Sequence, residues 1–342
     1  IHNVLENIEE ATEWSQAQIL EFVSEFQTDK NEAYKIIQKI STRLIQANSA
    51  ITIAAVRCCL NMCILVNDYK FTKETFNTIM LSLIALLNNN NEIRYSVLKS
   101  IFIILQKYSV LFENDVDTFF CKYDDLLYIK LVKIDLILTL TTEKNILKVL
   151  KELNSYTTQE NIEFVRKSIQ AIGRLSIVFE KTADTCVDYL IALIQTRIQY
   201  VVQECIVVAV NIFRRYPDKY ENLISTICQC VNSTLEDHRA KAAMCWILGE
   251  YSTVVTNAAE LIEGLFLDSF LDEPTNVQLS ILTAVVKFFL NFPEQGIAML
   301  KHVLSLITNE VDNPDIRDRA YMYLCLFAES PKYVQRIVMV KD

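Results

Sequence analysis

A repeat of 38 residues constrains the fold of this chain more than any other feature of its sequence. Five segments of fifteen residues follow this repeat, beginning at Val165, Gln203, Lys241, Leu279 and Arg317. Their eighth and eleventh positions are large and apolar in all five segments, and the fourth position is apolar in every segment except the one with Ser168. Positions 4, 8 and 11 lie on one face of a helix. The repeat therefore predicts a series of helices, each with one buried stripe.

A second apolar helix is expected after each of these first helices. Apolar residues at helical spacing follow the repeat segments, for example in residues 182–195 and 294–308. Pro217, Pro293 and Pro331 occupy the last position of their segments. Proline is tolerated in the first turn of a helix because its missing N–H has no partner there. The prolines thus predict where one helix ends and the next begins.

These helix pairs predict an all-α fold of the HEAT or armadillo type. Residues 127–140 keep the spacing, and residues 51–65 and 95–109 repeat the pattern less regularly. Length divided by period gives roughly nine pairs. One pair cannot bury its apolar face alone, so neighbouring pairs have to stack. We expect residues 1–342 to form a single α–α superhelix (solenoid) with a long surface for other proteins.

Composition excludes several classes of protein. The longest stretch without charge, residues 75–91, contains five Asn, so we expect a soluble protein with no membrane span. A net charge of −9 disfavours a protein that grips nucleic acid. The chain opens at Ile1 without a signal sequence, which indicates a piece of a longer cytoplasmic protein. Six cysteines lie in apolar helical patterns and are expected to act as small hydrophobic residues: Cys58, Cys63, Cys186, Cys205, Cys245 and Cys325.

No motif in the sequence predicts catalysis, a cofactor or a metal. The three histidines have no His or Cys partner at a ligand spacing, and Cys228 and Cys230 have no second cysteine pair. Four glycines are too few to build a dinucleotide-binding turn or a phosphate-binding loop. Paired carboxylates such as Asp124 and Asp125 are expected to be surface charges. We therefore expect a protein that is not an enzyme.

The segment HRAKAAMCWILGEY, residues 238–251, resembles a reactive site but fits the repeat. Met244, Leu248 and Tyr251 occupy the three apolar positions, and Trp246 lies on another face of the helix. Gly249 aligns with Gly173, which indicates close approach of a neighbouring helix at both positions. Packing is therefore favoured over chemistry for this segment.

Contact residues for a partner are harder to predict than the core. Leu248 and Phe289 are expected in the core, and Arg214 is expected at a solvated helix end. Trp246 and Tyr323 are candidate partner-binding residues, because Trp and Tyr often supply interface hot spots. Packing between repeats is the competing role for both.

Several segments also resemble the trunk of the beta subunits of clathrin adaptor complexes, the beta adaptins. The similarity runs in order from about Asn7 to the end, and WILGEY and DNPDIRDR are its most specific motifs. The resemblance implies the middle and C-terminal part of an adaptin trunk, with no hinge or ear. It leaves the type of adaptor complex open.

The same resemblance implies a role and a set of partners. The segment would be a scaffold that holds the medium (mu) chain, next to a second large adaptin and a small (sigma) chain, for cargo selection and coat assembly. It would act on the cytoplasmic side of trans-Golgi, endosomal or plasma-membrane coated pits and vesicles, with clathrin, lipid and GTPase contacts in regions outside this sequence. The alternative hypothesis is a HEAT-repeat nuclear transport receptor of the importin kind, with an enzyme third.

Overall fold

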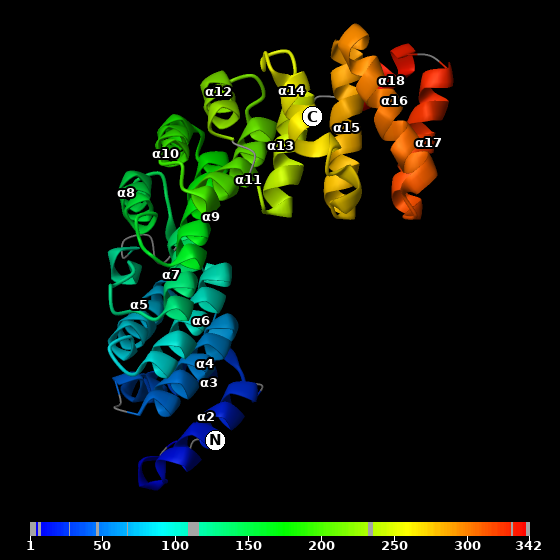
Figure 1. Ribbon diagram of the computed structural model, residues 1–342. Helices are drawn as coiled ribbons and strands as arrows, with labels where there is room; N and C mark the ends of the chain where they lie inside the picture. The colour runs from blue at the N-terminus through cyan, green and yellow to red at the C-terminus, as the bar shows by residue number, and fades with distance from the viewer. Residues whose placement is uncertain are drawn as a thin grey trace. The chain divides into compact units, whose positions relative to one another are not determined.

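The structure, a computed structural model, describes residues 5, 8–26, 28–45, 48–66, 68–108, 116–231, 235–329 and 331–339. Within these ranges the regular elements are helices and no strand occurs, as the repeat predicted. The chain divides into two compact units, Ile1–Val149 and Leu150–Asp342, and each is built from stacked helices (Figure 1). The single solenoid over the whole chain stays a prediction.

Unit 1 is a stack of helices in which α4 contacts α2, α3 and α5. Helices α2 and α3 both pack on α4, α5 packs between α4 and α6, and α6 packs on α7. Residues 109–115, after α6, lie outside the described residues. The elements are η1 (Ile8–Glu10), α2 (Glu13–Glu25), α3 (Lys30–Ile40), η2 (Ser41–Ile45), α4 (Ser49–Val66), α5 (Tyr69–Leu86), α6 (Asn91–Tyr108), η4 (Val116–Phe119) and α7 (Leu127–Leu140).

Helix α4 is the one helix in the described part of the chain that is long and apolar enough to cross a membrane. That property rests on length and composition alone, and the core helix of a soluble protein has it too. Slightly more than half of α4 is buried, at 56%. Its neighbours α2, α3 and α5 supply the contacts. Burial among other helices accounts for its apolar composition.

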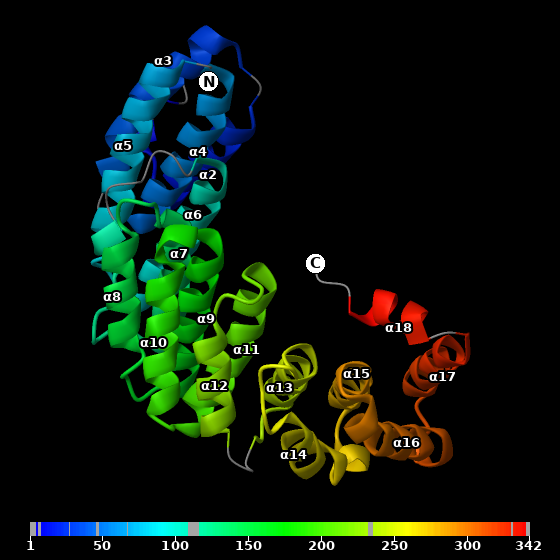
Figure 2. The same ribbon diagram turned by 90° about the horizontal axis from the view of Figure 1, so that it is seen from above.

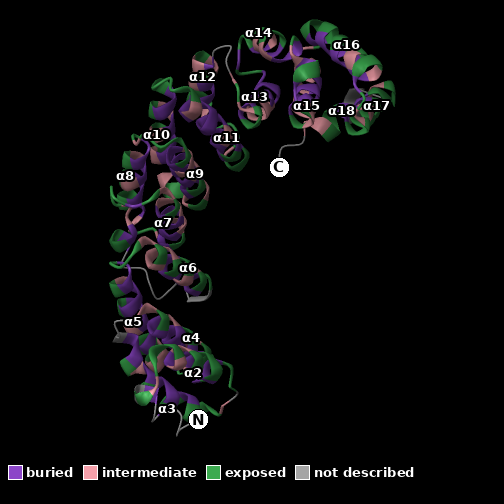
Figure 3. Ribbon diagram, turned by 60° about the horizontal axis from the view of Figure 1, so that its bottom comes forward, coloured by how far each residue is buried: buried purple, intermediate pink, exposed green. Residues whose placement is uncertain are grey.

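Unit 2 contains two layers of helices. The first-layer helices α9, α11, α13, α15 and α17 contact one another in that order, and α10 and α12 contact each other in the second layer. Buried residues lie between the helices (Figure 3). The elements are α8 (Ile146–Tyr156, across the unit boundary), α9 (Ile162–Val178), η5 (Glu180–Thr182), α10 (Ala183–Gln195), α11 (Gln199–Arg215), α12 (Glu221–Cys230), α13 (His238–Glu250), α14 (Ala258–Ile262), the π-helix η6 (Glu263–Leu267), η7 (Phe270–Asp272), α15 (Thr275–Asn291), α16 (Pro293–Glu310), α17 (Pro314–Glu329) and α18 (Pro331–Val338).

The predicted buried stripe is confirmed in α9, α11 and α13. In α15 and α17 some of its residues are at least partly exposed. Position 4 is buried in all five segments, including Ser168, whose hydroxyl donates a hydrogen bond to the Phe164 carbonyl at 2.8 Å. Leu248 is fully buried, whereas Phe289 is partly exposed and Leu324 is exposed. The placement of Phe289 in the core is therefore a partial error.

The prolines mark helix boundaries, as expected. Pro293 begins α16 and Pro331 begins α18. Pro217 lies in the turn between α11 and α12, where Asp218 adopts a left-handed backbone conformation with φ of 60°. The helices α11, α15 and α17 thus each end before the proline of their repeat segment.

Gly249 permits a close approach between two helices, as its alignment with Gly173 predicted. A Cβ atom at Gly249 would lie 2.8 Å from the Cα atom of Ala284 on α15. At Gly173 a Cβ atom would overlap the side chain of Val208 on α11. The two glycines therefore occupy equivalent contacts in α9 and α13.

We expect Gly249→Ala to lower the free energy of unfolding. Alanine would add up to about 1 kcal/mol of helix propensity, but overpacking typically costs about 1–3 kcal/mol. The clash is with backbone, which cannot rotate away as a side chain does. Gly264→Ala is the control, because a Cβ atom there meets nothing within 4 Å and should stabilise the protein. Urea unfolding measures both variants. A change of stability in the same direction for both would contradict the close approach of the two helices at Gly249.

A buried ion network joins α6 to the segment before α7 and corrects the assignment of Asp125 to the surface. The Asp125 side chain is 1% exposed and contacts Lys133 Nζ at 2.5 Å and Arg94 Nη1 at 3.1 Å. It also accepts the backbone N–H of Lys122 at 2.8 Å. Burial alone would raise the pKa of Asp125, but the hydrogen bonds from Lys133 and Lys122, and the charges of Lys133 and Arg94, lower it.

Candidate interaction surface

A groove of about 380 Å³ crosses the C-terminal ends of α11, α13 and α15. We call it the Trp246 groove, because Trp246, on the middle helix α13, lies between α11 and α15. A smaller cavity of about 190 Å³ between α13 and α15 shares Trp246 and Lys287 with it. The residues that line the groove are Phe213, Arg214, Pro217, Asp218, Trp246, Glu250, Tyr251, Thr253, Val254, Lys287, Asn291 and Met339.

The Trp246 ring is partly exposed and held from two sides. The guanidinium carbon of Arg214 lies 5.0 Å from the ring centroid, within the range of a cation–π contact. Tyr251 meets the ring edge-on, with centroids 6.4 Å apart. These contacts orient the indole while part of it remains open to solvent. A pre-oriented aromatic side chain loses little conformational entropy when a partner binds.

Polar contacts between α13 and α15 form another wall of the groove. Glu250 on α13 forms an ion pair with Lys287 on α15, and both side chains are mostly buried. Asn291 donates a hydrogen bond to the Ser252 hydroxyl at 2.8 Å. Because both interactions join successive repeats, they fix the width of the groove.

Tyr323, the second candidate contact residue, lies in the core and not on the surface. Its side chain belongs to α17, and the residue is 3% exposed. Its hydroxyl lies 3.4 Å from the Thr283 hydroxyl on α15. Thr283 in turn lines the smaller cavity beside Trp246. The structure therefore makes Tyr323 a packing residue between α15 and α17.

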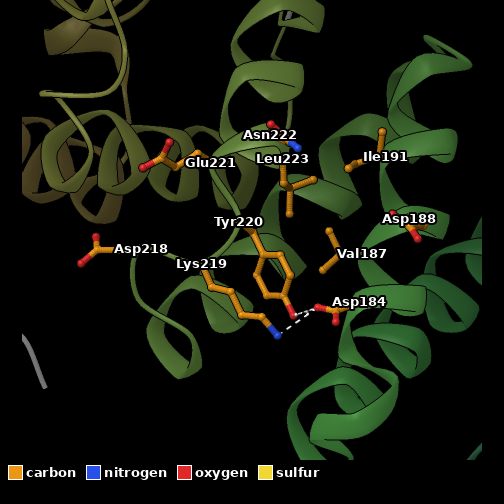
Figure 4. Close-up of a pocket in the computed structure, with 10 residues that line it drawn as sticks. All are labelled: Asp184, Val187, Asp188, Ile191, Asp218, Lys219, Tyr220, Glu221, Asn222 and Leu223. Carbon is orange, nitrogen blue, oxygen red and sulfur yellow. Dashed lines mark hydrogen bonds and ion pairs between the residues drawn. The ribbon is translucent and has the colours of Figure 1, made fainter.

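A separate pocket of about 480 Å³ lies between α10 and the start of α12 (Figure 4). Lys219 Nζ lies 2.9 Å from Asp184 Oδ1, and the Tyr220 hydroxyl donates to the same oxygen at 2.8 Å (Figure 4). These hydrogen bonds lower the pKa of Asp184. A general acid needs a raised carboxyl pKa, so this cluster has the properties of a surface ion pair and not of a catalytic acid.

The cysteines have the environment of packing residues, with one correction. Burial raises the pKa of Cys58 and Cys186 to about 12, and it also raises the pKa of Cys245. Cys325, which was expected to be buried, is exposed on α17. In the described ranges no group of three or more His, Cys, Asp or Glu side chains is arranged to hold a metal ion.

We expect Cys325 to react with a thiol reagent before the buried cysteines. The nucleophile is the thiolate, which burial disfavours at Cys58 and Cys186. A time course with Ellman's reagent on the folded protein should lose its fast phase in Cys325→Ser. An unchanged fast phase in that variant would contradict the exposure of Cys325.

Trp246, a candidate partner-binding residue, lines the groove, whereas the residues that hold it were not predicted from the sequence. Arg214 was interpreted as a solvated charge at a helix end, since nothing in its neighbourhood in the sequence indicates a ring above it. Glu250 and Lys287 occupy the tenth and ninth positions of successive repeat segments. Opposite charges at adjacent positions of neighbouring repeats are the signal that would have predicted this ion pair.

Comparison with known families finds one that matches almost the whole chain. Residues 1–331 match the family described as the Adaptin N terminal region. The AP-1 complex subunit beta-1 of Mus musculus is 41% identical over 343 aligned residues, covering 100% of this chain and 36% of the mouse protein. The AP-2 complex subunit beta of Schizosaccharomyces pombe is 33% identical, covering 99% of this chain and 50% of that protein. The chain thus spans about a third to a half of the length of these relatives.

Similar folds occur among solved structures. A homology model of the full-length AP-3 complex aligns with a TM-score of 0.64 and 18% identity, covering 86% of this chain and 51% of that chain. A crystal structure of a Kap121p mutant aligns with a TM-score of 0.60 and 14% identity, covering 95% of this chain and 38% of that chain. At these identities the likeness concerns the fold alone. The predicted HEAT-like solenoid fold is thereby confirmed.

Proposed function

The chain belongs to the adaptin family, as its resemblance to beta adaptins predicted, and we propose that it is a scaffold segment of the beta subunit of a clathrin-associated adaptor complex. In this role it has no catalytic activity. It holds the medium chain and supports the second large adaptin and the small chain of a heterotetramer. The observation that carries the proposal is the 41% identity to the AP-1 beta-1 subunit along the whole chain.

The Trp246 groove is the proposed contact surface for the medium chain. It crosses three successive first-layer helices, so one partner segment would touch several repeats at once. Trp246 would be the anchor, because a large aromatic side chain in a pocket is a common hot spot. Tyr323 would support the wall of the smaller cavity beside Trp246 through Thr283.

The proposed site of action is the cytoplasmic face of coated vesicles or the membranes from which they form. Clathrin, lipid and GTPase contacts would belong to parts of the protein outside this sequence. Identity is higher to AP-1 than to AP-2 beta subunits, at 41% against 33%, which supports an AP-1 type of complex. The importin hypothesis has only the shared fold in its support.

Calorimetric titration with the N-terminal half of the medium chain tests this proposal. We expect saturable binding, weakened at least about tenfold by Trp246→Ala, as for a hot-spot residue. Trp14→Ala is the matched control, because Trp14 is an exposed tryptophan on α2 in the other unit. Failure to bind the medium chain, together with capture of a basic nuclear import cargo, would contradict the adaptor function and favour the importin hypothesis.

A further inference from the structure

Helix α18 lies on the opposite side of the first layer from the second-layer helices before it. In unit 2, α14 and α16 lie on one side of α13, α15 and α17, whereas α18 lies on the other side (Figure 2). It packs against α17. The last helix therefore does not extend the second layer and instead covers part of the first layer.

The residue that follows α18 reaches the Trp246 groove. Met339 lines the groove together with Trp246 on α13 and Asn291 on α15. Val334 anchors α18 and is completely buried. Ile337, between these two, is 56% exposed and does not line the groove. Two apolar side chains, Val334 and Met339, thus attach this segment to the first layer.

We propose that α18 and Met339 form a displaceable cover of the Trp246 groove, which a partner has to move aside before it binds. The partner chemistry follows from the one apolar side chain that this segment adds to the lining of the groove, that of Met339. The partner is an amphipathic helix that places a Met or Leu side chain where Met339 lies in this chain. The regulatory part of this inference rests on the proposed role of the groove in binding the medium chain.

The cover is suited to displacement because it is short. An isolated helix of eight residues is unstable in water, so α18 depends on its few docking contacts. Segments with few buried contacts open at low free-energy cost. When a site is open only part of the time, the apparent affinity of a ligand falls by the open fraction. Docking of α18 therefore sets the affinity of the groove for a partner.

Quenching of Trp246 fluorescence by acrylamide tests whether the cover exists. The chain has two tryptophans, so Trp14→Phe leaves Trp246 as the single reporter in the full chain. We expect Met339→Ala and Val334→Asp each to increase quenching. Ile337→Ala, in the same segment but outside the groove, should leave quenching unchanged. No increase in the first two variants, with helical content retained, would overturn the cover.

A peptide of residues 331–339 tests whether the groove accepts such a segment in trans. The Val334→Asp chain, with its own cover undocked, should bind the peptide at least about tenfold more tightly than the unchanged chain. A peptide that carries Met339→Ser should bind the Val334→Asp chain more weakly than the unchanged peptide does. Equal affinities of the two chains would overturn the cover. Dimers in sedimentation that dissociate on addition of the peptide would also overturn its intramolecular form, because the cover would then come from a second copy.

The medium chain separates this inference from the proposed function. Its N-terminal half should bind the Val334→Asp chain more tightly than the unchanged chain. If the medium chain binds both equally, the regulatory part is overturned while the scaffold function stands. If it binds neither and Trp246 quenching responds as expected, the proposed function fails and the cover remains.

Discussion

Replacing Asp125 with alanine is expected to lower the free energy of unfolding by about 3–5 kcal/mol, the range for breaking a buried ion pair. The variant leaves the Lys133 ammonium in a site where its side chain is 5% exposed. The Phe120 carbonyl, 3.2 Å from Lys133 Nζ, would still accept a hydrogen bond from the ammonium group. Urea unfolding followed by circular dichroism measures the loss, and hydrogen exchange locates it in α6 and α7.

An exposed ion pair of the same unit is the control for Asp125. Asp117 and Lys148 form an ion pair whose side chains are 59% and 62% exposed. Such pairs contribute about 0–1 kcal/mol, so Asp117→Ala should change little. The double variant Asp125→Leu, Lys133→Met should recover most of the loss, because it removes both buried charges. Equal effects of Asp125→Ala and Asp117→Ala would contradict the burial of the network.

The Asp125 network should also contribute to the acid sensitivity of the protein. The pKa of Asp125 is lower in the folded state than the unfolded value of about 3.9. Its stabilisation is therefore complete above about pH 4 and is lost as the pH falls through the folded pKa. Asp125→Asn should show a shallower loss of stability in this acidic range than the unchanged protein.

Leu248→Ala is expected to lower the free energy of unfolding by about 2–5 kcal/mol, as a fully buried leucine replaced by a small residue. Phe289→Ala should cost less than a fully buried aromatic would, because Phe289 is partly exposed and rests edge-on against Phe327 with centroids 5.5 Å apart. Trp246 lies on the same helix as Leu248, so its fluorescence during urea unfolding reports the change. A loss below about 0.5 kcal/mol for Leu248→Ala would contradict the buried stripe.

Periodicity predicted the helices because their burial depends on spacing within one helix. Met244, Leu248 and Tyr251 are buried where their positions in the repeat predicted. Gly249 was interpreted correctly for the same reason, since a close helix approach recurs at one position of the repeat. Features that repeat along the chain are therefore accessible from the sequence.

Contacts that occur once were not accessible from the sequence. Asp125 was taken for a surface charge because Asp124 and Asp125 are adjacent, and only the fold brings Arg94 and Lys133 to it. Tyr323 was a candidate contact residue because an aromatic residue does not indicate which side of α17 it occupies. The position of α18 depends on packing against the first layer, which its own residues do not specify.

Assembly with the three other proposed adaptor subunits tests whether this chain is a scaffold that holds other proteins. The chain would be co-expressed with the medium chain, the second large adaptin and the small chain, and the purified product would be weighed by native mass spectrometry. We expect a complex that contains one copy of each subunit. Recovery of this chain alone, while the other three subunits are folded and present, would contradict it.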